Sequence, residues 1–331
     1  ALPNLPNAFI PNIIRSYMAR GVSLTCVDVL KRTSAVEQMI ALDALAHVPR
    51  QNPTLPASVL APGLWELSNK VPAPKLGEGR AMISPRAETH LLLSRVPSLS
   101  DDLLGKRLAL WSHLNLLEGI PKVNGSSTLQ LREQAQVQSL LYASTNTDLP
   151  RLADFLGVSH TTTPGQIVDW SPRRTHLPLV TAGQRPIFAE ATETLSALTN
   201  ATFDPGKVVY LPPEARPFIT ATNEVETKII SPRFAPHQIG FEIEARGASL
   251  VVIAQSFYHP WHAYVDGTAT PLWRANHACQ ALEVKAGRHR VELVYEDGRF
   301  KLGAGVSALT LLLCGVLWFR HSRDKSGEAS V

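Results

Sequence analysis

Residues 302–319 read LGAGVSALTLLLCGVLWF, and this stretch decides how the rest of the chain is arranged. Its eighteen residues carry no charge, and crossing the hydrocarbon core of a bilayer takes roughly 17 to 25 apolar residues. The alternative is a buried helix of a soluble protein, but such a helix usually keeps a polar face. Here the polar side chains are Ser307, Thr310 and Cys314, which cost little in lipid. We therefore expect one transmembrane helix over residues 300–320.

The residues that follow this helix indicate its direction. Trp318 and Phe319 stand where aromatic side chains meet the membrane–water interface. A basic cluster comes next, and basic residues beside a membrane span are typical of its cytoplasmic side. We therefore expect a cytoplasmic tail at 321–331 and place everything before the helix in the periplasm or outside the cell. The cluster consists of Arg320, His321, Arg323 and Lys325.

Working back from the helix, residues 216–299 have the pattern of an antiparallel β-sheet. Ile239, Phe241 and Ile243 alternate with small or polar residues, as one buried sheet face requires. Residues 291–295 repeat this alternation, while residues 249–257 form a more continuous apolar run that is typical of a central strand.

Two dipeptides in this region predict tight turns between strands. They are Asp266-Gly267 and Ala286-Gly287, and glycine supplies the positive φ that such turns require. Several short strands at this spacing favour an antiparallel β-sandwich over residues 216–299.

Residues 76–215 alternate between helical and strand-like patterns, which predicts a mixed α/β domain. The clearest helix is LREQAQVQSLLYAS at 131–144, where Ser127 and Gln130 have the spacing of a capping box. Asp148 and Gly157 have the positions of the start and stop signals of a second short helix. We expect a further helix at 190–198 and strands at 158–162 and 207–211.

Prolines crowd the stretch before this domain, which indicates an extended linker over residues 49–75. Residues 1–48 contain helical spacing at 37–48 and predict a short helical N-terminal segment. No basic stretch followed by an apolar one opens the chain, so we expect no signal peptide. The prolines are Pro49, Pro53, Pro56, Pro62, Pro72 and Pro74.

Composition excludes several classes of protein. A hydrophobic content of 44% argues against disorder, and the formal net charge of +4 comes from scattered basic residues, which does not support nucleic-acid binding. Cys26, Cys279 and Cys314 are odd in number and far apart, so a disulfide framework is not expected.

Local catalytic motifs are missing from the sequence. It contains no nucleophile elbow, phosphate-binding loop, dinucleotide-binding loop or His-Glu-x-x-His zinc motif, and we expect no cofactor. Glu242 and Glu244 are two residues apart on one predicted strand and so share its polar face. We interpret this face as solvated rather than the two carboxylates as a catalytic pair. His259, His262 and His277 lack a neighbouring cysteine or a helical His pair, so we expect no metal site.

The predicted hairpin around Asp266-Gly267 offers aromatic faces beside polar groups, the combination on which sugars stack and form hydrogen bonds. The competing interpretation is that these aromatic side chains fill the sandwich core while Asp266-Gly267 only makes the turn. The Asp266-Gly267 turn places both Trp261 and Trp273 on this hairpin, and we expect Trp261 to support the sandwich and Trp273 to be more exposed and available to a glycan. The candidate saccharide-binding residues are Tyr258, Trp261, Tyr264, Asp266, Trp273, Arg274 and Asn276.

The run SFYHPWHAYVDGTATPLWRANHACQALEVKAGRHRVELVYEDGRFKLGAGVSALTLLL at 256–313 resembles the C-terminal end of the YfhO family of bacterial membrane proteins. LADFLGVSHTTT at 152–163 and NLLEGIPKVNGSSTLQL at 115–131 are similar to upstream segments of that family, and the resemblance covers about 50–320. His259-Pro260 departs from the family's Pro-Gly. The matching motif residues are Trp261, Val265, Asp266, Gly267, Ala286, Gly287 and His289.

The resemblance implies a relation to polytopic glycosyltransferases of the GT-C type, which use lipid-linked sugars and act at the bacterial inner membrane. Their multi-helix catalytic core has no counterpart here, because residues 1–48 carry too many charges to cross lipid. We therefore expect a non-catalytic extracytoplasmic domain that binds a glycan, a lipid-linked sugar or a polytopic membrane partner. The alternative is a membrane-anchored enzyme of unrecognised mechanism that acts on a cell-envelope saccharide.

Overall fold

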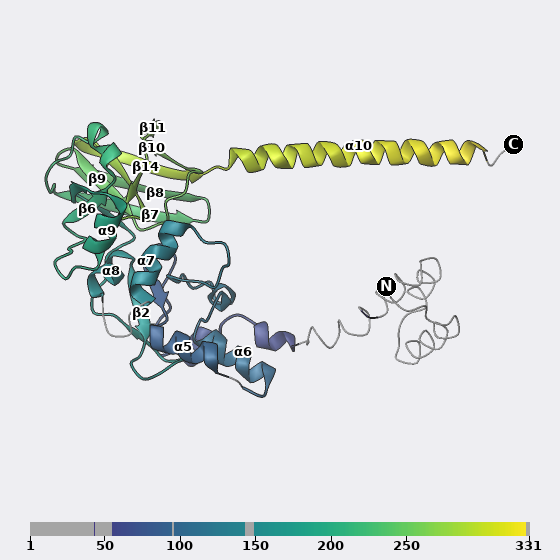
Figure 1. Ribbon diagram of the computed structural model, residues 1–331, viewed down its shortest axis with the longest axis horizontal. Coiled ribbons are helices and arrows are strands. Elements are labelled where there is room, and N and C mark those ends of the chain that lie inside the picture. Colours follow the sequence, from purple (N-terminus) through teal and green to yellow (C-terminus); the bar gives the residue numbers. More distant parts are fainter. Residues whose placement is uncertain (1–42, 44–54, 95, 143–148, 329–331) are drawn as a thin grey trace, which may run out of the picture. The chain divides into compact units, whose positions relative to one another are not determined.

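The computed structural model describes residues 43, 55–94, 96–142 and 149–328, with side chains as far as Trp318 (Figure 1). The chain divides into two compact units, residues 1–60 and residues 61–331. In the first unit the described element is the 3-10 helix η1 (Ala57–Leu60). The helix expected at 37–48 lies outside the described residues, apart from Asp43.

The second unit contains short helices before and between its strands and one long helix at its end. The helices are α4 (Leu64–Ser68), α5 (Pro85–Leu93), α6 (Leu99–Leu108), η2 (Leu114–Leu117), α7 (Arg132–Tyr142), α8 (Pro150–Phe155), α9 (Ala191–Leu198), η3 (Pro213–Phe218) and α10 (Gly298–Glu328).

Its strands form four described sheets. The three-stranded sheet has the order β1 (Arg80–Met82), β2 (Val158–Thr162), β3 (Trp170–Pro172). The five-stranded sheet has the order β11 (Thr268–Thr270), β10 (Trp261–Val265), β14 (Gly287–Tyr295), β8 (Gln238–Ala245), β7 (Thr227–Ala235). The four-stranded sheet has the order β12 (Trp273–Ala275), β13 (Cys279–Val284), β9 (Ser249–Ile253), β4 (Val180–Ala182), and β5 (Arg185–Phe188) pairs with β6 (Val208–Leu211).

The five-stranded sheet is antiparallel and follows the alternation expected from the sequence. Ile239, Phe241 and Ile243 of β8 are buried, and Phe241 pairs with Val291 of β14 while Ile239 pairs with Leu293. Since successive side chains of a strand point to opposite faces, this register brings the apolar residues of both strands to one face.

Strand β9 is buried along its whole length, but it covers only residues 249–253 of the apolar run at 249–257 from which a central strand is expected. It lies between β13 and β4, so both of its edges are paired. Val251 and Ile253 belong to a buried cluster that also contains Ile243 of the five-stranded sheet. Leu250 and Val252 point the other way, into a second cluster with residues of α7, α8, α9 and β6. Both faces of this strand therefore contact apolar side chains.

Part of the predicted proline-rich linker is folded onto the domain. Residues 64–68 form α4, and Trp65 is buried beside Trp170 in a third cluster. The Trp65 indole donates to the Val71 carbonyl at 3.0 Å. Prolines exclude long regular elements, but the burial of one tryptophan stabilises a short helix between them.

The predicted start of α7 differs from the observed one. The helix begins at Arg132, and the Ser127 hydroxyl donates to the Leu129 carbonyl instead of capping the helix. Gly157, with φ of 68°, ends the short helix α8, and β2 and α9 form where they are expected.

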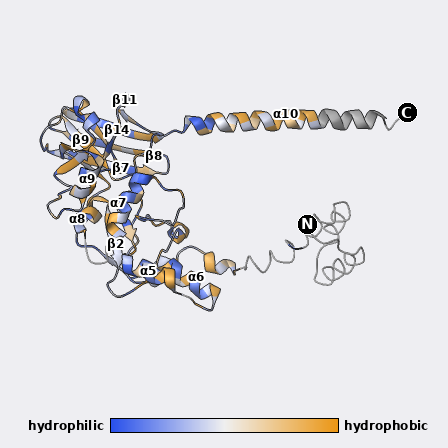
Figure 2. Ribbon diagram, viewed as in Figure 1, coloured by the Kyte–Doolittle hydropathy of each residue, from blue (hydrophilic) through white to orange (hydrophobic). Residues whose placement is uncertain are grey.

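Helix α10 contains the stretch Gly298–Trp318, the only one in the described part of the chain that is long and apolar enough to cross a membrane. None of this stretch is buried, and its apolar residues are visible in Figure 2. The described chain is thus a sheet-rich structure with several helices and one apolar C-terminal helix. The division into domains at residues 75 and 215 stays a prediction.

Candidate functional site

The candidate site is a cleft beside the start of α5, and a short hydrogen-bond network fixes this start. Ser84 is the N-cap residue, and its hydroxyl accepts from the Ala87 backbone N–H at 3.3 Å. Pro85 follows at the first helical position, where its missing N–H costs nothing. Thr162 at the end of β2 donates to the Ser84 hydroxyl at 2.7 Å and accepts from the Ser84 N–H at 3.0 Å. The helix start is therefore tied to the sheet.

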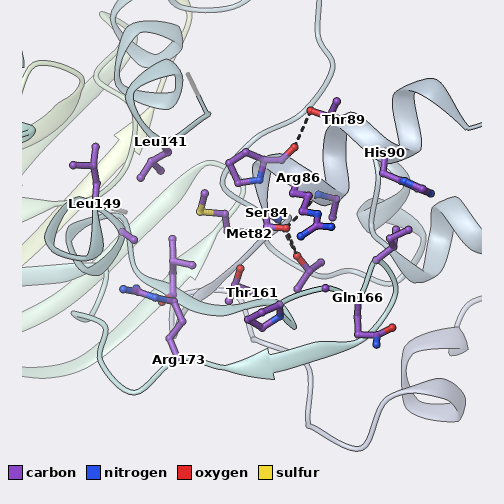
Figure 3. Close-up of a pocket in the computed structure, with 18 of the residues that line it drawn as sticks. Met82, Ser84, Arg86, Thr89, His90, Leu141, Leu149, Thr161, Gln166 and Arg173 are labelled. Carbon is purple, nitrogen blue, oxygen red and sulfur yellow. Dashed lines mark hydrogen bonds between the residues drawn. The ribbon is translucent and has the colours of Figure 1, made fainter. Parts of the chain in front are cut away.

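The cleft has a volume of about 1080 Å³ and lies between α5, β2, the ends of α7 and α8, and residues 164–167. Small-molecule sites typically have volumes of roughly 300 to 1,000 Å³, so the space is ample for a substrate-sized ligand. Figure 3 shows Leu141 and Leu149 at one end and Arg86 and His90 of α5 toward the other. Arg173 lies near Leu149, so the end with the two leucines also carries a charged group, and the cleft combines apolar and polar side chains.

Charge in the cleft comes from arginine. Arg173 is held by an ion pair with Asp154 at 3.0 Å and donates to the Val158 carbonyl at 2.9 Å. Arg86 is exposed at the second residue of α5, where the positive end of the helix dipole adds to its own charge. The described residues that line the cleft include no carboxylate. These features favour an anionic group on a bound ligand.

Hydroxyl and amide groups supply the remaining polar surface. They can donate to and accept from a bound ligand, and they come both from the start and end of α5 and from β2 with residues 164–167. Ser84 and Thr162 are already engaged with each other, so Thr161 and Gln166 are the better candidates for direct contact. The polar uncharged lining residues are Ser84, Thr89, Ser94, Thr161, Thr162 and Gln166.

Several half-buried polar groups lie beside α5 and the residues that precede it. Glu88 accepts from the Asn124 amide at 2.9 Å, and burial raises the pKa of its carboxyl above the usual value. Burial lowers the pKa of Lys122 to about 8, and its ammonium donates to the Leu110 and Ser112 carbonyls at 2.7 Å each. The Tyr142 hydroxyl donates to the Ile83 carbonyl at 3.0 Å. Asn124 and Tyr142 therefore tie α5 and the residue before its cap to neighbouring segments, whereas Lys122 holds residues 110 and 112.

The predicted saccharide residues near β10 lie apart from this cleft. Trp261 is buried with 9% of its surface exposed, and its ring is 5.5 Å from that of Tyr295. Tyr258 is half-buried and lies 6.4 Å from the same ring. Tyr264 alternates with buried residues and therefore points to the opposite sheet face. The Asp266 carboxylate accepts from the Arg290 N–H at 2.8 Å and stabilises the turn.

The expectation that both tryptophans share one hairpin is wrong. The Asp266-Gly267 turn joins β10 to β11, whereas Trp273 begins β12 and pairs with Ala281 of β13 in the other sheet. Strand β11 ends at Thr270, and the chain then enters the other sheet with β12. Trp261 is buried and Trp273 half-buried, as expected, but the separation of their sheets removes the shared surface.

Arg274 and Asn276, the other predicted residues of this segment, are used inside the fold. Arg274 forms an ion pair with Glu133 at 3.1 Å and lies over the Phe257 ring at 4.9 Å. Asn276 is buried, and its side-chain oxygen accepts from the Tyr210 N–H at 2.9 Å. Saccharide contact by the seven predicted residues stays a prediction, but the structure does not bring them together.

The structure also places the histidines and the glutamate pair that the sequence analysis considers as a metal site and a catalytic pair. His259 and His262 are exposed, and His277 contacts the Gln136 side chain at 2.8 Å. Within the described ranges, no three His, Cys, Asp or Glu residues group in a way that could hold a metal. Glu242 and Glu244 lie on one sheet face and both pair with Arg288, which supports the interpretation of a solvated face.

Sequence reasoning missed the cleft. Its residues come from stretches around 82–94, 141–153, 158–167 and 173, and no spacing rule joins them. The local signal is Ser84-Pro85 at a helix start, which is common in proteins and does not by itself indicate a site.

A scan of the sequence against protein-family models and a search of curated proteins found no match.

Proposed function

We propose that this chain is a non-catalytic extracytoplasmic domain of a membrane-anchored, glycosyltransferase-like protein of the YfhO type, and that its cleft binds a lipid-linked sugar. The observation that carries this proposal is the cleft itself, which combines apolar side chains, hydroxyl and amide groups and two arginines, with no carboxylate among the described lining residues. The relation to the YfhO type depends on the motif around Trp261, Asp266 and Gly267.

A lipid-linked sugar has three chemical parts, and the cleft has a counterpart for each. Leu141 and Leu149 suit the first isoprene units of the lipid, and Arg86 at the start of α5 suits the phosphate. Thr161 and Gln166 offer hydrogen bonds to sugar hydroxyls. Free glycans lack the apolar and anionic parts, so they match fewer of these groups.

Binding is favoured over catalysis by the state of the hydroxyl groups. A nucleophilic serine needs a base within hydrogen-bond distance. The Ser84 hydroxyl instead accepts from the Ala87 N–H and from Thr162, so it acts as a helix cap. This engagement supports the domain role rather than the alternative of an enzyme acting on an envelope saccharide.

The proposal also includes the architecture and the orientation of the chain. The five-stranded and four-stranded sheets form a β-sandwich, an arrangement supported by the single buried cluster to which Ile243, Leu293, Val251 and Leu282 contribute. The basic residues after Phe319 keep the tail in the cytoplasm, so the domain faces the periplasm from the inner membrane of a bacterium. A polytopic membrane partner would supply the catalytic helices.

Binding of farnesyl phosphate to the purified full-length chain tests the proposed ligand. We expect Arg86→Gln to weaken binding by about tenfold or more, because a charge-assisted hydrogen bond contributes roughly 1.5 to 3 kcal/mol. Leu149→Gln should also weaken binding, because it replaces one of the two leucines that would contact the isoprene units with a polar side chain. Titration calorimetry in detergent measures both affinities.

Two matched variants serve as controls. Arg174→Gln removes a charge at an exposed position outside the cleft, and Leu129→Gln changes a leucine that is 89% exposed. Neither should alter the affinity. No binding of farnesyl phosphate to the wild-type chain, or an equal loss in the control variants, would contradict the proposal.

A further inference from the structure

A cluster of rings lies where the sheet-rich domain joins α10. It consists of His237, Tyr258, His259, Trp261 and Tyr295, and we call it the ring cluster. The Tyr295 ring is at its centre, with ring centroids at 6.0 Å from His237, 6.4 Å from Tyr258 and 5.5 Å from Trp261. His259 lies 4.4 Å from Tyr258 and is exposed, as is His237.

Backbone hydrogen bonds tie the three segments of the cluster together. The Tyr295 N–H donates to the His237 carbonyl at 2.9 Å, and the Glu296 N–H donates to the Pro260 carbonyl at 2.8 Å. The cluster is therefore fixed to the last residues of β14.

Very little chain separates these bonds from the membrane helix. Asp297 caps α10, because its carboxylate accepts from the Phe300 N–H at 3.0 Å, and the helix begins at Gly298. From Gly298 to Leu302, where the uncharged stretch starts, the helical rise is about 6 Å. A headgroup layer is roughly 5 to 8 Å thick. If the hydrocarbon core begins at Leu302, the ring cluster therefore lies at the depth of the headgroup layer.

The side chains of this region have the chemistry of the membrane interface. Tyrosine and tryptophan combine an apolar ring with a polar group and are enriched at the headgroup level. Phe300 is 73% exposed, and Arg299 beside it is exposed and suits a lipid phosphate, whereas Lys301 pairs with Glu296 at 3.7 Å. In the cluster His237 and His259 are exposed, Tyr258 and Tyr295 are half-buried and Trp261 is buried, so the two tyrosines are the amphipathic rings that can meet the headgroups.

We propose that the ring cluster rests in the phospholipid headgroup layer and gives the domain a second contact with the membrane. The inference depends on the proposed anchoring by α10. It predicts that the end of the sheet at Trp261 lies in the interface, while the Asp266-Gly267 end of β10, roughly 17 Å farther along the strand, lies in water.

Site-specific labelling of the full-length chain in vesicles tests this contact. Cys26→Ser and Cys314→Ala remove two thiols, and Cys279 stays, because burial raises the pKa of its thiol to about 12 and keeps it unreactive at neutral pH. An environment-sensitive fluorophore is attached to His259→Cys or, as a second position, to His237→Cys. Thr268→Cys, exposed at the opposite turn, is the matched control.

The vesicles contain phosphatidylcholine and phosphatidylglycerol with a quencher on either the headgroup or the acyl chain. We expect the headgroup quencher to remove most of the fluorescence at positions 259 and 237 and little at position 268. Leu309→Cys in α10 reports on the anchor and should respond to the acyl-chain quencher.

The experiment distinguishes failure of the anchoring by α10 from failure of the headgroup contact by the ring cluster. If fluorescence is quenched at position 309 but as little at positions 259 and 237 as at position 268, the ring cluster does not contact the membrane. The inference is then wrong although α10 crosses the bilayer. If position 309 is not quenched, α10 does not cross the bilayer, and the anchoring and the inference are both wrong.

Discussion

At the scale of single residues, the polar and aromatic groups that suggest a sugar site from the sequence serve the fold. Asn276 is an example, because its amide oxygen satisfies the Tyr210 N–H and its φ of 44° lies in the left-handed region that asparagine tolerates. A buried polar group of this kind forms hydrogen bonds inside the fold and cannot contact a ligand. Whether such a residue has a structural or a binding role therefore depends on whether other parts of the chain bury it.

The two tryptophans allow a direct test of this principle. Trp261→Ala should lower the free energy of unfolding by roughly 3 to 5 kcal/mol, because it removes a buried large ring. Trp273→Ala should cost less, since its ring is half-buried and packs beside Phe218 at 5.4 Å. Chemical denaturation of both variants gives the difference. An equal loss would show that both rings are core residues and would end the saccharide interpretation of Trp273.

Lys122 predicts a pH dependence of stability. Its pKa in the folded chain is about 8, below the usual value of about 10.4 for an unfolded chain. Between these two pKa values, Lys122 binds more protons in the unfolded chain than in the folded chain. Its contribution to the free energy of unfolding therefore rises with pH in this range.

We expect Lys122→Met to reduce the slope of stability against pH between about pH 8 and about pH 9.5, as measured by urea denaturation. Lys285→Met, at an exposed lysine, should leave that slope unchanged. A slope that is identical in wild type and Lys122→Met would show that the ammonium is not perturbed by burial.

At the scale of elements, the junction between β4 and β5 depends on one glycine. Gly183 has a φ of 91°, its N–H donates to the Leu250 carbonyl and its carbonyl accepts from the Val225 N–H. A Cβ at this position would lie 2.2 Å from the Val225 carbonyl oxygen. The close approach lets the segment before β7 lie against the start of β5.

Gly183→Ala should therefore destabilise the chain by roughly 1 to 3 kcal/mol more than Gly63→Ala. Gly63 has a similar φ of 93°, but a Cβ there meets nothing within 4 Å, so that variant reports the backbone strain alone. Thermal unfolding of both variants measures the difference. Equal midpoints would mean that the Val225 segment shifts without cost.

At the scale of the whole molecule, a membrane crossing by α10 predicts that the residues before this helix and those after it lie on opposite sides of the membrane. A reporter fused after Val331 should give a cytoplasmic signal, and one inserted at Glu224 should give a periplasmic signal, because basic residues follow the apolar stretch. Paired alkaline phosphatase and fluorescent protein fusions make this measurement. The same signal from both positions would exclude a single crossing by α10.

The sequence by itself determines the elements that have a local period. The uncharged stretch predicts α10, and the alternation at 239–243 predicts the buried face of β8. The apolar run at 249–257 predicts a central strand, and its first five residues form β9. These predictions succeed because backbone geometry imposes a period of two or 3.6 residues on whichever side chains become buried.

Only the tertiary structure decides which elements become neighbours. It pairs β4 with β9, places Trp261 and Trp273 in different sheets, packs Trp65 of the proline-rich stretch against Trp170, and assembles the cleft from distant stretches. None of these contacts has a local period. They result from the burial of apolar surface between residues far apart in the chain, and this burial is not encoded in any single window of sequence.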